Sequence, residues 1–239
     1  SDDVKENGDV ISVSLDVTNV SETDSDEVVQ IYFRMENPSV KRPLRQLVAF
    51  ARERIEGGRT RHFEFDIKKS ELRFYDVSRE RFAVEQGRYT FMAGASSEDI
   101  RLTKTIDVSG EIIPPRELCK GVKAKNYDGK CGTKMKYSKK LEQHYMLGGG
   151  LIYNNCVLGE ADSIEIVCGS RVNTGKITVR YGGETLCEAE VKPTVDVTKF
   201  ETVTAQFDKA VLAGIDREKP AVFELWMPEQ IYILGFRTY

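Results

Sequence analysis

Residues 11–19 read ISVSLDVTN, in which apolar and polar side chains alternate with period two. This is the pattern of a β-strand with one face on a core and the other in water. Similar short segments, rich in β-branched and aromatic residues, follow at VVQIYFRM (28–35), LVAFARERI (47–55), RHFEFDI (61–67), RFAVE (81–85), RYTFMAGA (88–95) and RLTKTIDV (101–108). About seven strands separated by turn sequences predict an antiparallel β-sandwich.

The alternation is interrupted at residues 108–118, VSGEIIPPREL. A Pro-Pro pair favours extended polyproline geometry and cannot continue a β-ladder. We therefore place a domain boundary at Pro114-Pro115, which divides the chain into domains 1–113 and 114–239. The length of 239 residues also fits two domains better than one.

The second half returns to strand patterns. They occur at LIYNNCVL (151–158), DSIEIVCG (162–169), GKITVRYGG (175–183), TLCEAEV (185–191), FETVTAQF (200–207), AVFELWM (221–227) and IYILGFRT (231–238). Gly182-Gly183 predicts a hairpin turn, and KYSKKLEQHYML at 136–147 is compatible with a short helix that the glycines at 148–150 would end. The predicted fold class is all-β, with two β-sandwich domains in tandem.

Composition excludes several classes of protein. A content of 40% hydrophobic and 31% charged residues is ordinary for a globular protein, and the net charge of −3 gives no overall basic field for nucleic acid. The longest apolar runs are far shorter than the ~20 residues of a membrane-spanning helix. We therefore expect neither nucleic acid nor a membrane as partner.

The sequence offers little material for catalysis. It contains only two histidines, His62 and His144, and no GxSxG, HExxH or P-loop pattern. The acidic turn at Asp24, Asp26 and Glu27 lacks the further ligands and the glycine of a calcium loop. The carboxylate pairs Glu53/Glu56 and Glu188/Glu190 could act as general acid and base at a glycosidic bond. A position on a solvent-exposed strand face, where they add solubility, explains them more simply. We predict no catalytic and no metal-binding residue.

Five cysteines follow residue 118 without any CxxC pair: Cys119, Cys131, Cys156, Cys168 and Cys187. Small buried side chains in a reduced protein explain them best, with disulfides or a reactive thiol as alternatives. No secretory signal opens the sequence, and a mature fragment would lack one too. The compartment stays open, with a bacterial-type cytoplasmic location slightly favoured over secretion.

Aromatic residues near predicted loops of the second half are candidate sugar platforms, because sugars stack their C–H faces on flat rings. Core packing is the alternative for each of them. They are Tyr127, Tyr145, Tyr153, Phe200, Trp226 and Tyr232.

Four blocks in the first half share order and spacing with a known family: DEVVQIYFR (26–34), KRPLRQLVAFARERIEGGRTRHFEFDI (41–67), ELRFYDV (71–77) and EQGRYTFMAGASSEDIRL (85–102). They resemble the fibronectin type III-like domain at the C-terminal end of glycoside hydrolase family 3 enzymes, which are β-glucosidases, β-xylosidases and relatives. The resemblance implies a non-catalytic portion of such an enzyme, with the catalytic residues in upstream domains. It also implies that the domain packs against the catalytic body and exposes apolar surface in isolation.

The second half resembles the family 6 carbohydrate-binding modules at VKAKNYD (122–128), LGGGLIY (147–153), TKFETV (198–203) and IYILGF (231–236). This implies a jelly-roll-like sandwich that binds oligo- or polysaccharide. The sugar-stacking pair of such modules corresponds to Tyr153 and Phe200, with Glu142 as a hydroxyl acceptor and Gln230 in place of an asparagine. Lys125 stands where an acidic calcium ligand is usual, so no cofactor is expected.

A second hypothesis belongs to another class of function: both sandwiches are structural, and a surface contacts a protein partner without binding sugar. A contiguous apolar patch on the first sandwich, with no aromatic-lined groove on the second, would favour this alternative.

Overall fold

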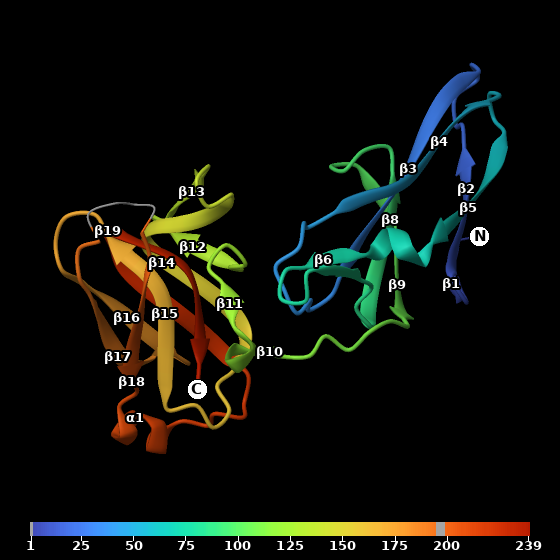
Figure 1. Ribbon diagram of the computed structural model, residues 1–239. Coiled ribbons are helices and arrows are strands. Elements are labelled where there is room, and N and C mark those ends of the chain that lie inside the picture. The colour runs from blue at the N-terminus through green and yellow to red at the C-terminus, as the bar shows by residue number, and fades with distance from the viewer. Residues whose placement is uncertain (1, 195–198) are drawn as a thin grey trace. The chain divides into compact units, whose positions relative to one another are not determined.

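The computed structural model describes residues 2–194 and 199–239. The chain folds into two compact units, Ser1–Ile113 and Pro114–Tyr239. Both are built almost entirely of β-strands (Figure 1), so the predicted all-β class is confirmed. The division lies at the Pro114-Pro115 pair.

The first unit contains three antiparallel sheets, ordered β1-β2-β5, β4-β3-β8-β9 and β6-β7. A short 3₁₀ helix spans Lys69–Leu72. The strands are β1 (Asp3–Asn7), β2 (Val10–Thr18), β3 (Ser25–Met35), β4 (Gln46–Ile55), β5 (Thr60–Lys68), β6 (Phe74–Asp76), β7 (Arg81–Ala83), β8 (Gly87–Gly94) and β9 (Ile100–Val108).

The alternation at residues 11–19 decides how β2 is oriented. Ile11, Val13 and Leu15 are buried, whereas the residues between them are only partly covered. Ile11 lies opposite Ile67 and Leu15 opposite Phe63 on β5. These side chains join those of β3 and β8 in one core between the two larger sheets.

The second unit contains one large mixed sheet around a second core. A 3₁₀ helix spans Leu118–Lys120, and one α-helix, α1, spans Lys209–Gly214. The strands are β10 (Arg116–Glu117), β11 (Val122–Lys123), β12 (Gly129–Cys131), β13 (Lys134–Ser138), β14 (Gln143–Val157), β15 (Ser163–Ser170), β16 (Gly175–Tyr181), β17 (Glu184–Val191), β18 (Glu201–Gln206) and β19 (Ala221–Thr238).

The two longest strands, β14 and β19, organise this sheet. The first half of β19 pairs with β16 and the second half with β15, while β14 pairs with both halves. Leu225 on the first half and Ile233 on the second belong to the same buried core. The sheet therefore bends around one core. The jelly-roll assignment stays a prediction.

Three local predictions for the second unit are wrong. Residues 136–147 form parts of the antiparallel hairpin β13-β14 and not a helix. The glycines at 148–150 lie inside β14, where Gly148 and Gly149 have φ of 60° and 73° at a shift in register with β19. The segments 221–227 and 231–238 form one strand, β19. This strand can include Pro228 because Pro228 lies in the register shift and forms no pair with β14.

The hairpin predicted at Gly182-Gly183 is confirmed. Both glycines have positive φ, 58° and 94°, and they join β16 to β17. Helix α1 had no counterpart among the predictions. The Asp208 carboxylate caps it by accepting a hydrogen bond from the Ala210 amide at 2.8 Å.

Candidate functional site

The outer face of the sheet β4-β3-β8-β9 carries apolar side chains. Leu47 lies opposite Tyr32, which lies opposite Met92 on its other side. Phe50 is 69% exposed and Leu47 51% exposed, and Val28 is also exposed. Tyr32 and Met92 on the same face are buried. We call these five residues, Val28, Tyr32, Leu47, Phe50 and Met92, the apolar face, of which Val28, Leu47 and Phe50 are the exposed part. Grouped apolar exposure of this kind marks interaction surfaces.

Polar atoms beside the apolar face are bonded within the unit. The Tyr32 hydroxyl donates to the Gln30 side chain, and the Gln30 amide nitrogen donates to the Ala95 carbonyl at 2.6 Å. Burying this part of the surface against a partner would therefore cost little in lost hydrogen bonds with water.

The loop before β4 holds one more exposed apolar side chain in place. The buried Arg42 guanidinium pairs with the Glu85 carboxylate and lies 3.9 Å from the centre of the Phe74 ring. Arg45 donates to a backbone carbonyl in the loop after β8. Leu44, between these two arginines, is 84% exposed. The contacts of Arg42 and Arg45 therefore hold the loop in a conformation that leaves the Leu44 side chain in water.

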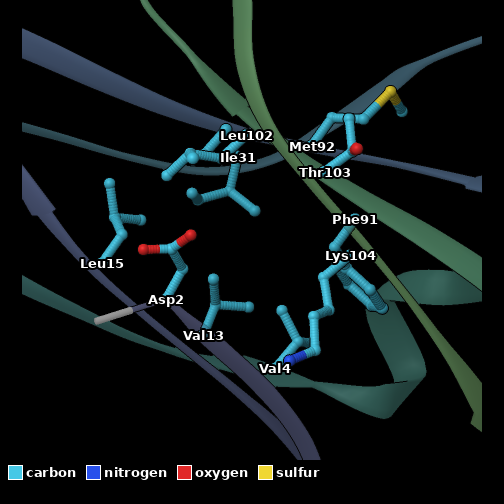
Figure 2. A pocket seen from close by; sticks show the side chains of 11 residues that line it. Asp2, Val4, Val13, Leu15, Ile31, Phe91, Met92, Leu102, Thr103 and Lys104 are labelled. Carbon is cyan, nitrogen blue, oxygen red and sulfur yellow. The ribbon is translucent and has the colours of Figure 1, made fainter.

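A recess opens between the two larger sheets of the first unit (Figure 2). Val13, Leu15, Ile31 and other apolar side chains line it, and the Asp2 side chain points into it. It encloses about 40 Å³, room for a few water molecules and too little for a sugar ring. We interpret it as a packing gap of the sandwich.

Tyr153, one of the two predicted sugar-stacking residues, cannot present its ring to a ligand. It is fully buried, and its hydroxyl donates to the Ala124 carbonyl at 3.0 Å. Burial raises the pKa of this hydroxyl. The alternation along β14 places Tyr153 opposite Phe223, on the core face of the sheet. The sugar-stacking prediction for Tyr153 is therefore wrong.

Phe200, the other predicted stacking residue, is only partly buried. Its ring centre lies 6.2 Å from that of Tyr145 and 5.0 Å from that of Tyr232, and the Tyr145 and Tyr232 rings are 5.8 Å apart. Tyr232 is fully buried, and its hydroxyl donates to the Lys199 carbonyl at 3.0 Å. We call these three residues the aromatic cluster. Phe200 and Tyr145 offer its accessible part.

The two polar residues of the predicted sugar site lie close in sequence to members of this cluster. Glu142 is exposed in the turn before β14, with φ of 50°, three residues before Tyr145. Gln230 is half-buried on β19, two residues before Tyr232. Phe200, Glu142 and Gln230 stay predicted ligands. Thr198, at the start of the TKFETV segment, lies outside the described residues.

Trp226 is half-buried on the side of β19 opposite to the core residues Leu225 and Met227. It pairs with Gly150, where a Cβ atom would lie 2.7 Å from the indole ring. Because glycine has no side chain, the indole ring of Trp226 can pack directly against the backbone of Gly150.

Sequence reasoning missed a local concentration of positive charge, because it considered only the net charge. Residues 120–140 contain eight lysines and one acidic residue, Asp128. Lys134 and Lys136 are exposed on β13, and Lys139 is exposed in the turn that follows. We call Lys134, Lys136 and Lys139 the basic hairpin. Counting charge in windows along the sequence would have found it.

The cysteines divide into two groups, and none forms a disulfide. Cys156 and Cys168 are buried, which raises the pKa of each thiol to about 12, and half-buried Cys187 has a pKa of about 11 for the same reason. Cys119 and Cys131 are exposed. The interpretation of all five as core residues is therefore wrong for these two.

Four of the seven acidic residues considered for calcium or acid-base chemistry form surface ion pairs. Asp24 pairs with Arg54 at 3.3 Å, Asp26 with Arg52 at 2.7 Å, Glu53 with Arg61 at 2.5 Å and Glu188 with Lys176 at 2.7 Å. Within residues 2–194 and 199–239, no three His, Cys, Asp or Glu side chains gather as metal ligands would. Nor does this part of the chain contain a helix long and apolar enough to cross a membrane.

Comparison with known proteins finds relatives for the first unit. Residues 27–97 match the fibronectin type III-like domain family. The chain is 35% identical over 98 residues to a β-glucosidase of Rhizobium radiobacter and 30% identical over 110 residues to thermostable β-glucosidase B of Acetivibrio thermocellus. These matches cover 41% and 46% of this chain but only 12% and 14% of the relatives.

Among solved structures, β-glucosidase from Kluyveromyces marxianus in complex with glucose aligns with 45% of this chain and 13% of its own, at 31% identity and a TM-score of 0.44. The sequence matches show that residues 27–97 of the first unit are homologous to a fibronectin type III-like region of β-glucosidases.

Proposed function

We propose that this chain is a non-catalytic portion of a family 3 β-glycosidase of the β-glucosidase or β-xylosidase class, and that its first unit supports the catalytic domains. The observation that carries the proposal is the 35% identity to a segment that makes up 12% of a β-glucosidase. A segment of that size in a large enzyme has neighbouring domains to contact.

The apolar face supplies the surface for that contact. Phe50 and Leu47 have more than half of their area exposed, and the polar atoms of Tyr32 and Gln30 beside them are already bonded. Covering such side chains contributes about 25 cal/mol for each Å² of apolar surface removed from water. Leu44, on its anchored loop, lies three residues before Leu47 in the chain.

The test uses a chimaera, in which residues 1–113 replace the matched region of the Rhizobium radiobacter β-glucosidase. We expect the chimaera to hydrolyse a chromogenic β-glucoside and to melt within a few degrees of the parent. Leu47→Asp with Phe50→Asp should lower the melting temperature by several degrees, because each carboxylate would be buried without a partner.

The matched control is Val20→Asp with Phe82→Asp, since these side chains are 94% and 58% exposed but lie outside the apolar face. A control that lowers the melting temperature as much as the test variant would contradict the choice of surface. An unfolded or inactive chimaera would contradict the supporting role itself.

For the second unit we propose glycan binding at the aromatic cluster, with Phe200 as the stacking residue and Glu142 and Gln230 as hydrogen-bonding residues. The partly exposed rings of Phe200 and Tyr145 support this candidate, since each stacked ring contributes about 1 kcal/mol. Weak binding of this kind would raise the local concentration of substrate near the enzyme.

Millimolar cello- or xylo-oligosaccharide should shift the amide resonances around Phe200 and Gln230, and Phe200→Ala should abolish the shifts. Phe82→Ala, an exposed ring in the first unit, is the control and should leave them unchanged. A spectrum that no oligosaccharide moves would instead favour the purely structural, protein-interacting alternative.

A further inference from the structure

Positive charge is concentrated in one segment of an acidic protein. Residues 120–140 contain eight of the lysines, whereas the whole chain has a net charge of −3. The rest of the chain is therefore clearly acidic, and the field around these lysines is local.

The single acidic residue of this segment does not offset the lysines. The side chain of Asp128 is only 5% exposed, its carboxylate lies 3.4 Å from the buried Arg116 guanidinium, and it accepts a hydrogen bond from the Asn154 amide at 2.7 Å. Its charge is thus compensated inside the unit. Glu142 in the adjacent turn is exposed, and so is Glu229, whose backbone lies beside Gly148.

Strand pairing places two lysines on the sheet face that carries the aromatic cluster. Lys136 lies opposite Tyr145 and Lys134 opposite Leu147, which in turn lies opposite Tyr232 on β19. Residues directly opposite one another share a face of the sheet. Lys134 and Lys136 are two positions apart, so their Cα atoms are about 7 Å from one another along β13.

We propose that the basic hairpin and the aromatic cluster together bind an acidic polysaccharide, whose uronate carboxylates lie at Lys134 and Lys136 and whose sugar ring packs on Tyr145 and Phe200. This inference rests on the glycan binding proposed above, and it names the class of glycan. A lysine ammonium pairs with a carboxylate without the planar geometry that arginine requires.

Charge density favours an acidic glycan over nucleic acid. Duplex DNA carries one charge for about every 1.7 Å of its axis, and an acidic protein would repel most of that charge. A uronate polymer carries at most one charge per sugar ring, so a few lysines beside two aromatic rings suffice to hold a short stretch of it.

Polygalacturonate is the probe, and the full chain is titrated with it by calorimetry at low and at physiological salt. We expect binding that is at least tenfold tighter than that of neutral cello-oligosaccharide and that weakens with added salt. Lys134→Glu with Lys136→Glu should weaken it roughly tenfold or more, while leaving binding of the neutral oligosaccharide within twofold.

Lys209→Glu with Lys219→Glu is the matched control, because it makes the same change in net charge at exposed positions of the same unit. It should leave polygalacturonate affinity within twofold. Circular dichroism checks the fold, and Lys134→Gln with Lys136→Gln repeats the test without introducing negative charge.

The possible failures can be told apart. Neutral oligosaccharide bound as tightly as polygalacturonate would overturn the present inference and leave the glycan site standing. Binding of neither probe would overturn both. A single-stranded DNA oligomer bound more tightly than polygalacturonate would overturn it in favour of a nucleic-acid surface.

Discussion

Gly150 shows how one residue without a side chain controls the packing of the single tryptophan. A Cβ atom at this position would lie 2.7 Å from the Trp226 ring. We expect Gly150→Ala to lower the free energy of unfolding of the second unit by about 1–3 kcal/mol, because strand and indole would have to separate. Urea denaturation followed by tryptophan fluorescence measures this in the full chain.

Gly214→Ala is the control for that substitution, since nothing lies within 4 Å of a Cβ atom there. The same fluorescence transition should stay at its midpoint or move slightly higher, because alanine favours the helix that Gly214 ends. A Gly150→Ala protein as stable as the parent would show that the indole has room to move.

His62 provides a pH-dependent contact on the polar face of β5. Its Nδ1 atom lies 2.6 Å from the Asp16 carboxylate, which raises the pKa of the imidazole above its usual 6.5. The contact also requires an ionised Asp16 carboxylate, whose pKa is lowered below its usual 3.8, so it stabilises the fold fully between about pH 4 and pH 6.5. This contribution is lost as the pH rises through the pKa of the folded state.

Asp16→Asn should return the pKa of His62 towards 6.5, because the amide cannot balance the imidazolium charge. Titration of the imidazole resonances by NMR measures this directly. His144, the only other histidine, serves as an internal reference. An unchanged His62 titration in Asp16→Asn would contradict the assigned cause.

At the scale of elements, the buried Arg42–Glu85 pair connects the loop before β4 to the segment between β7 and β8. Glu85 also accepts a hydrogen bond from the Ser39 amide at 3.0 Å. We expect Arg42→Ala to destabilise the first unit by about 3–5 kcal/mol, because it leaves a buried carboxylate without its cation. Hydrogen exchange of β3 and β8 amides in the full chain measures the loss.

Arg52→Ala removes an ion pair of similar composition at an exposed position, Arg52–Asp26, and should cost at most about 1 kcal/mol. The double variant Arg42→Ala with Glu85→Ala should be less destabilised than Arg42→Ala alone. Equal losses in Arg42→Ala and Arg52→Ala would show that burial does not determine the effect.

Strands were predictable from the sequence where their faces differ in polarity. Residues 11–19 and 61–67 alternate clearly, and β2 and β5 bury the expected side chains. The helix expected at 136–147 failed because its residues find partners across a hairpin, with Glu142 in a left-handed turn conformation. The helix propensity of a short segment carries no information about which strand that segment will pair with.

The sugar site was less predictable than the fold. Tyr153 matched an aromatic position of the resembled modules, but its side of β14 depends on strand pairing, and that side is the core. Tyr145 lies on the other side and contacts Phe200. Both tyrosines lie on β14, eight residues apart, so simple alternation along a strand would place them on the same face. The register shift between Leu147 and Gly149 lies between them, and the sequence does not predict it.

At the scale of the whole molecule, the two kinds of surface are carried by different units. Exposed apolar side chains form a face on the first unit, and residues 120–140 of the second unit contain eight lysines. Net charge and overall composition average these features away, which is why they indicated only an ordinary globular protein. The distribution of residue types is what supports a docking role for one unit and a ligand-binding role for the other.

The apolar face also predicts how the chain behaves without its proposed catalytic partner. Phe50 and Leu47 then stay in water, and two copies can cover them by meeting face to face. We expect a concentration-dependent dimer in sedimentation velocity over the micromolar to millimolar range. Leu47→Asp with Phe50→Asp should keep the chain monomeric, because pairing the faces would then bury like charges.

Salt distinguishes this association from one driven by charge. Apolar contact should persist or strengthen at high salt, whereas contact between the basic hairpin and acidic surface of another copy would weaken. Lys134→Glu with Lys136→Glu should therefore leave the dimer intact. A chain that stays monomeric at millimolar concentration would argue against the apolar face as a docking surface. It would show that exposing Leu47 and Phe50 does not make the protein associate measurably.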